Sequence, residues 1–235
     1  MTNTAAASGA TAPLSLPARV IGIVTSPKAT FEAVVRHPKW FGMLAFVTLA
    51  MAALIGGFLS TAVGQAAWLE QLPPEMPDAQ YESMLRFSKF LGIVGVGQML
   101  IMVPLITLIL SGIFYALFNA MGGDSTFKQV LTVTAHASVI SVLGQVFTVP
   151  LNYARGKLAS ATNLTSLLPM VDEKSFVGRL MAMVDLFVIW WVLVLAMGLA
   201  VLYRRRTQPI ALTLFGVYAA IALVAAAVMS RLGGA

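Results

Sequence analysis

The sequence contains no cysteine and only two histidines among its 235 residues. Without cysteine, the chain cannot form disulfides, use thiolate chemistry, hold zinc through thiolates or be palmitoylated. With two histidines and no HExxH-like cluster, the motifs assemble neither a metalloprotease nor a nucleophile–base pair. We therefore expect a protein that is not an enzyme and that holds no metal or cofactor.

Charged residues are also scarce, at 10% of the chain, whereas 59% of the residues are hydrophobic. Soluble domains have about 45–50% apolar and about 25% charged residues. A soluble fold of this size could not bury so much apolar surface, so the lipid bilayer is the expected surrounding. The net charge of +6 does not indicate nucleic acid, because the basic residues lie mainly at the ends of apolar runs, where lipid headgroups would meet them.

Residues 1–17 are small and polar and lack the basic and apolar regions of a secretory signal. We expect them to be a disordered tail. Residues 18–40 predict two short amphipathic helices, the second with Ser26 as N-cap and Pro27 at its first position. Basic residues opposite an apolar stripe are typical of a helix on the membrane surface, although a helix packed on the bundle has the same pattern.

Residues 41–232 predict a five-helix transmembrane domain. A bilayer core of about 30 Å needs roughly 20 apolar helical residues, and five segments qualify: 41–63, 90–118, 129–149, 180–202 and 210–229. The fold class is therefore all-α, a polytopic transmembrane bundle with five spans and short amphipathic N-terminal helices. The alternating pattern of a membrane barrel is absent from the sequence.

Five crossings place the N-terminus, the Gly122 loop and the turn of Arg204, Arg205 and Arg206 on one side of the membrane. That side holds eight Lys and Arg residues and the other side seven. The dense triple arginine decides the orientation, because basic residues next to span ends favour the cytoplasm. We expect a cytoplasmic N-terminus and a C-terminus outside.

His136 and Asp185 are the ionisable residues nearest to intramembrane positions. Such residues form a possible intramembrane polar site, for example a proton or ion relay. They enter from opposite sides, so we expect no direct pair, and we interpret each as a structural polar contact between helices. Gly92, Gly95 and Gly97 lack the strand that precedes a dinucleotide loop and predict close helix packing instead.

The stretch from Phe114 to Leu131 resembles the Yip family of small membrane proteins. It contains a helix end, the Gly122–Gly123 turn, a small polar pair, Phe127 and then the next helix. Residues 135–140 contain no proline, where many members have one, so a kink there is not assured.

Two further motifs add to this resemblance. Asp185, Phe187 and Trp190 match the Asp-x-Phe-x-x-Trp start of a later helix in prokaryotic members, and Ser26-Pro27 followed by Phe31 matches the pattern before the first span. The short N-terminal region also resembles prokaryotic members. The resemblance implies a five-helix bundle with a cytoplasmic N-terminus in a prokaryotic plasma membrane. Eukaryotic relatives bind small prenylated GTPases, but fold analogy alone does not transfer that function.

The leading hypothesis is a non-catalytic membrane scaffold or organiser that binds membrane proteins or lipids, or that self-associates. It is motivated by the resemblance, the small-residue seams and the absence of catalytic motifs. The alternative is a small-solute or ion transporter, motivated by Asn119, His136, Gln145 and Asp185 in or near spans. An intramembrane enzyme is the third hypothesis.

Overall fold

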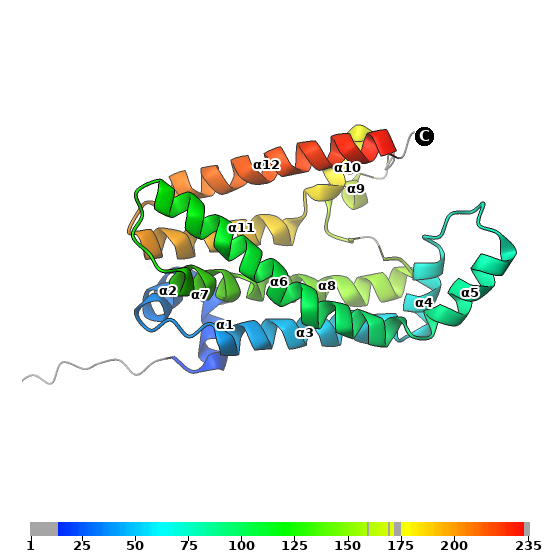
Figure 1. Cartoon of the computed structure of the whole chain (residues 1–235), viewed down its shortest axis with the longest axis horizontal. Coiled ribbons are helices and arrows are strands. Elements are labelled where there is room, and N and C mark those ends of the chain that lie inside the picture. Colours follow the sequence, from blue (N-terminus) through cyan, green and yellow to red (C-terminus); the bar gives the residue numbers. More distant parts are fainter. Residues whose placement is uncertain (1–13, 159, 169, 172–174, 233–235) are drawn as a thin grey trace, which may run out of the picture.

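Long apolar stretches form helices here, because backbone amides in hydrocarbon must find partners within their own segment. The computed structural model describes residues 14–158, 160–168, 170–171 and 175–232, and in these residues helices are the ordered elements apart from one isolated bridge (Figure 1). Five helical segments of the described chain are long and apolar enough to cross a membrane: α3 (Phe41–Leu59), α6 (Leu91–Ala120), α7 with α8 (Phe127–Ala137 and Val139–Arg155), α11 (Leu186–Tyr203) and α12 (Thr207–Leu232). The fold class predicted from the sequence is confirmed.

The third span, made of α7 and α8, is the centre of the bundle. In its most apolar window 67% lies inside the structure, against 11% for α6. Helix α7 packs against α6 and α11, while α8 packs against α3 and α11. Helix α6 crosses the bundle obliquely beside α3, and α12 lies along its outer edge (Figure 1). The most lipid-facing spans are therefore α6 and α12.

The third span is broken at Ser138 even without a proline. Helix α7 ends at Ala137 and α8 begins at Val139. The amide of Ser141 donates to the carbonyl of Ser138, a tight turn of the 3₁₀ type. The side chain of Ser138 donates to the carbonyl of Thr134 at 3.0 Å, and such back-bonding bends helices.

The fourth span begins later than the sequence pattern predicts. Residues Phe176–Met183 form a separate helix, α10, and Val184 and Asp185 are extended. Helix α11 begins only at Leu186, because the carboxylate of Asp185 caps its first amides. Asp185 thus lies at the start of the span rather than inside it.

The N-terminal helices are α1 (Leu16–Thr25) and α2 (Pro27–Arg36). Most of the predicted tail lies outside the described residues, and α1 starts at Leu16. The apolar face of α2 packs against α11 and α7, with Phe31 fully buried. The apolar face of α2 therefore packs on the helical bundle and does not face lipid.

Close packing joins α3 and α6. A Cβ on Gly56 would lie 2.3 Å from Val96 Cγ2, and one on Gly92 would lie 2.7 Å from Ser60 Cβ. A Cβ on Gly95 would meet Leu59 Cδ1 at 2.9 Å. The packing role predicted for Gly92 and Gly95 is confirmed, but it does not extend to Gly97, around which space is open.

The end of the bundle away from α1 and α2 carries short connecting helices. They are α4 (Ala62–Leu69), α5 (Asp78–Ser88), the single turn α9 (Leu164–Leu167) and α10. Helix α5 projects away from the spans at this end (Figure 1).

Candidate functional site

The Gly122–Gly123 turn ends α6 in a Schellman motif. Gly122 has φ of +83°, and its amide donates to the carbonyl of Asn119. The amide of Gly123 donates to the carbonyl of Phe118 at 3.0 Å. A left-handed residue at this position is most often glycine, because a Cβ would be strained there.

Gly123 is required for a different reason, which is contact with Tyr203. A Cβ on Gly123 would lie 2.4 Å from Tyr203 Cε1. Ser125 Oγ donates to the Tyr203 hydroxyl at 2.7 Å, and that hydroxyl donates to Asn119 Oδ1 at 3.1 Å. Asn119 Nδ2 closes the triangle by donating to the carbonyl of Ser125 at 3.1 Å. The loop between α6 and α7 is thus joined to the end of α11.

Phe127 begins α7, after an N-terminal capping box formed by Thr126 and Gln129. Its ring packs edge-on against Tyr115 with centroids 6.2 Å apart. The side chain remains 39% exposed. Phe127 therefore presents an exposed aromatic side chain that another molecule can contact.

Asp185 joins the segment around residues 160–162 to the start of α11, at the end of the bundle away from the Gly122–Gly123 turn. Its Oδ1 accepts from the amides of Phe187 (2.8 Å) and Val188 (3.3 Å). Its Oδ2 accepts from Ser160 Oγ (2.7 Å) and Thr162 Oγ1 (2.5 Å). Burial raises the pKa of Asp185, but these four hydrogen bonds outweigh it, so the pKa lies below its usual value.

Phe187 and Trp190 form the packing half of the same motif. A Cβ on Gly144 of α8 would lie 3.0 Å from Phe187 Cγ, so the ring of Phe187 sits directly on α8. Trp190 stacks on Phe187 with centroids 6.2 Å apart. Asp-x-Phe-x-x-Trp is therefore a capping residue followed by an aromatic pair that fixes α11 to the third span.

His136 lies in a separate place from Asp185. Its Nδ1 is 2.7 Å from the carbonyl of Thr132, and its Nε2 is 3.3 Å from Arg19 Nη1. Arg19, on α1, also donates to the carbonyl of Lys39 at 3.1 Å. Burial lowers the pKa of Arg19. Within the described part of the chain, the hydrogen bonds of His136 and those of Asp185 share no residue.

A cavity of about 670 Å³ lies between α3, α6, α8 and α11. Polar side chains line it at spacings of three and four residues: Ser138 at the break, and Ser141, Gln145, Thr148 and Asn152 of α8. Sequence reasoning noted Gln145 but missed the stripe as a whole. The signal was present, since this spacing places all five on one helix face.

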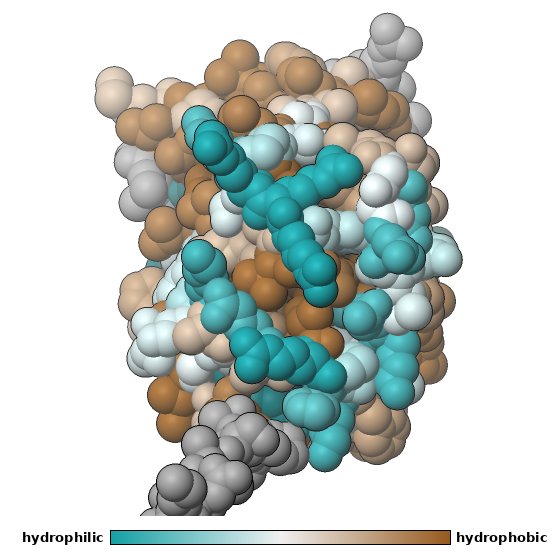
Figure 2. All heavy atoms as spheres, turned by 90° about the vertical axis from the view of Figure 1, so that its left-hand side faces the viewer, coloured by the Kyte–Doolittle hydropathy of each residue, from teal (hydrophilic) through white to brown (hydrophobic). Residues whose placement is uncertain are grey.

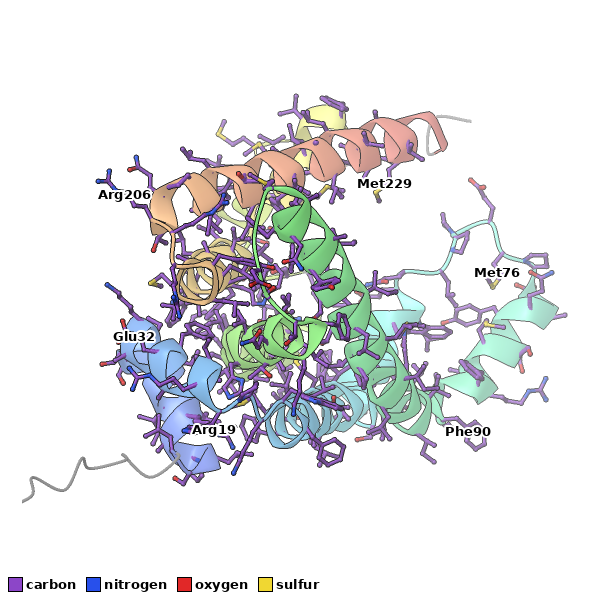
Figure 3. All side chains as sticks on the ribbon, turned by 60° about the vertical axis from the view of Figure 1, so that its left-hand side comes forward. Arg19, Glu32, Met76, Phe90, Arg206 and Met229 are labelled. Carbon is purple, nitrogen blue, oxygen red and sulfur yellow. The ribbon has the colours of Figure 1, made fainter. Side chains whose placement is uncertain are left out.

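Basic residues gather at the end of the bundle that carries α1 and α2, which we call the basic end. It holds eight Lys and Arg residues and two acids: Arg19, Lys28, Arg36, Lys39, Lys128, Arg204, Arg205 and Arg206, with Glu32 and Asp124. Figure 2 views this end and shows hydrophilic side chains around an apolar centre. In Figure 3, Arg19, Glu32 and Arg206 lie at this end, opposite Met76 and Phe90.

The described residues of the opposite end have a nearly balanced charge. They comprise five acids and six bases: Glu70, Glu75, Asp78, Glu82 and Asp185, with Arg86, Lys89, Arg155, Lys157, Arg179 and Arg231. The excess positive charge is thus concentrated on one side of the spans.

Comparison with known proteins agrees with this geometry. The model of the Yip1 domain matches residues 21–229. The chain is 26% identical over 229 residues to the membrane protein YknW of Bacillus subtilis (strain 168), covering 91% of this chain and 92% of that protein. No solved structure matches. With the motif turns, the five spans and this match in agreement, the chain belongs to the Yip1 domain family, as a multi-pass membrane protein of the prokaryotic type.

Proposed function

We propose that this Yip-type membrane protein is a non-catalytic organiser that holds membrane-protein partners at its basic end. The observation that carries the proposal is the separation of charge: eight bases against two acids at one end, and six bases against five acids in the described residues at the other. A one-sided positive field attracts acidic partner surfaces and orients them before contact.

The rigidity of this end supports the proposal. Phe31 and Ile23 are fully buried, so α1 and α2 are anchored to the spans. Arg205 Nη2 donates to the carbonyl of Met121 at 2.8 Å, which ties two turns together. A preformed surface loses little conformational entropy on binding. In this proposal the basic end faces the cytoplasm of the cell membrane, in keeping with the positive-inside rule.

The test is in-cell crosslinking from exposed positions. Photo-reactive residues replace Glu32 on α2 and Phe127 on α7, with Tyr81 on α5 as the control at the opposite end; all three side chains are exposed. We expect a reproducible membrane protein captured from Glu32 and Phe127 but not from Tyr81. The double variant Lys28→Glu and Arg36→Glu should reduce this capture several-fold.

Capture that is equal at Tyr81, or unaffected by the charge reversal, would contradict the proposal. Capture of lipid alone would do the same and would assign the basic end to anionic headgroups. A protein that stays monomeric in mild detergent and captures nothing would also count against an organiser.

A second function, transport of a small solute or ion, is favoured by the polar stripe of α8 inside the spans. It requires Gln145 and Asn152 to face a permeation path. Flux in proteoliposomes should then be lost in Gln145→Leu, and also in Asp185→Asn and His136→Ala if these residues form the predicted polar site. Unchanged flux in all three variants would reject this function.

A further inference from the structure

We propose that the cavity between α3, α6, α8 and α11 binds a neutral, hydroxyl-bearing glycerolipid. Its acyl chain lies along α3 and α6, and its ester and hydroxyl groups meet α8 and Trp191. This site lies within the spans and does not depend on a partner at the basic end.

The cavity has the size and walls of a ligand site. Its volume of about 670 Å³ lies within the roughly 300–1,000 Å³ typical of pockets that enclose small molecules. One side is apolar and is formed by Val47, Met51 and Ile55 of α3 with Val103 and Ile106 of α6. Water has no hydrogen-bonding partner along such a wall, whereas an acyl chain is compatible with it.

The other side carries polar atoms without partners. Asn152 Oδ1 and Trp191 Nε1 are buried and make no hydrogen bond within the described residues. Asn152 is only 9% exposed, and both residues line the cavity. Because an unpaired buried polar atom is unfavourable, the two predict a ligand that donates one hydrogen bond and accepts another. A diacylglycerol has a hydroxyl that donates and ester carbonyls that accept.

The charge of the lining disfavours anionic ligands. Among the described residues that line the cavity, Asp185 is the one ionisable group. Its carboxylate already accepts four hydrogen bonds. An anionic ligand, such as a phosphate or a carboxylate, would therefore enter without a compensating positive charge, which a hydrocarbon-level site disfavours strongly.

The cavity is accessible from the surroundings of the spans. Ile106, one of its lining residues, is 52% exposed, and α6 is the span least covered by the bundle. The lining residues of α3 and α6 lie within the membrane-crossing stretches. A lipid can thus enter sideways from the bilayer without crossing an aqueous phase.

The experiment uses the full chain in phosphatidylcholine nanodiscs with a diacylglycerol that carries a diazirine in one acyl chain. We expect labelled peptides from α3, α6 or α8 that include cavity-lining residues, and competition by unlabelled diacylglycerol. The variants Trp191→Phe and Asn152→Leu should each reduce the competed labelling about fivefold, the change expected for one neutral hydrogen bond. Trp68→Phe on α4 is the matched control and should not change it, because Trp68 does not line the cavity.

Ser141→Leu, which fills the cavity, provides a further variant. It should abolish the competed labelling while the protein elutes as a single species, which separates ligand loss from misfolding. Labelling restricted to outward faces of the spans would overturn the proposal. So would equal labelling by a diazirine phosphatidylcholine or fatty acid, or labelling that neither Trp191→Phe nor Asn152→Leu reduces.

Discussion

Arg19 Nη1 donates to Nε2 of His136 across 3.3 Å, which joins the first helix of the chain to the break in the third span. Because a guanidinium only donates and the carbonyl of Thr132 only accepts, both contacts of the imidazole are satisfied by one tautomer. His136 is therefore neutral, with its proton on Nδ1. His136 therefore acts as a hydrogen-bond acceptor that holds α1 through Arg19, rather than as a free proton carrier.

Removal of the His136 imidazole should weaken the attachment of α1 to the spans. In His136→Leu, the partly buried guanidinium of Arg19 loses an acceptor, at an expected cost of about 1–3 kcal/mol. Limited trypsin digestion in detergent should cleave at Arg19 or Lys28 several-fold faster than in the wild type. Arg36→Ala, at an exposed position of α2, is the control. Equal cleavage rates in His136→Leu and the wild type would show that the contact does not hold α1.

Phe31 of α2 packs so closely on α11 at Gly198 that a side chain at position 198 should not be tolerated. A Cβ there would lie 2.6 Å from Val133 Cγ1 and 2.8 Å from Phe31 Cε1. Gly198→Ala should therefore lower stability by about 1–3 kcal/mol through overpacking, as measured by thermal unfolding in detergent. Gly216→Ala on α12, where space is open, should be neutral or slightly stabilising. Similar melting temperatures for the two variants would refute this account of α2 docking.

Asp185 predicts loss of stability in acid. Its pKa is lower in the folded state than in the unfolded chain, so its stabilising effect is complete above the unfolded pKa and is lost as pH falls through the folded value. The melting temperature of the wild type should fall more steeply than that of Asp185→Asn as pH drops below about 4. Parallel pH profiles would show that the four hydrogen bonds do not favour the carboxylate.

Tyr203→Phe tests the link between the Gly122–Gly123 turn and α11. The variant removes one acceptor for Ser125 and one donor to Asn119 while the ring stays on Gly123. A loss of about 0.5–1.5 kcal/mol is expected for each hydrogen bond, measured by thermal unfolding. Tyr153→Phe, whose ring is exposed, should have no effect. If both variants melt alike, the polar triangle contributes nothing measurable.

Some of the fold followed from sequence alone. Hydrocarbon requires long, uncharged helical stretches, so residues 41–63 and 90–118 could be recognised as spans without any contact information. Gly122 likewise marked a helix end, because glycine is the residue that most often adopts the left-handed conformation after a helix, and this preference depends on the residue itself. These features depend on the order of neighbouring residues along the chain.

Other features depend on residues that are distant in sequence, and only the tertiary structure decided them. The sequence around Phe31 does not indicate that its ring packs on Gly198, and the sequence around Arg19 does not indicate that it hydrogen-bonds to His136. The polar face of α8 could be listed from its spacing, but its meaning came from Trp191 and α6, which complete a cavity around it. Local sequence determines where helices begin and end, whereas contacts between helices depend on the shape of both partners at once.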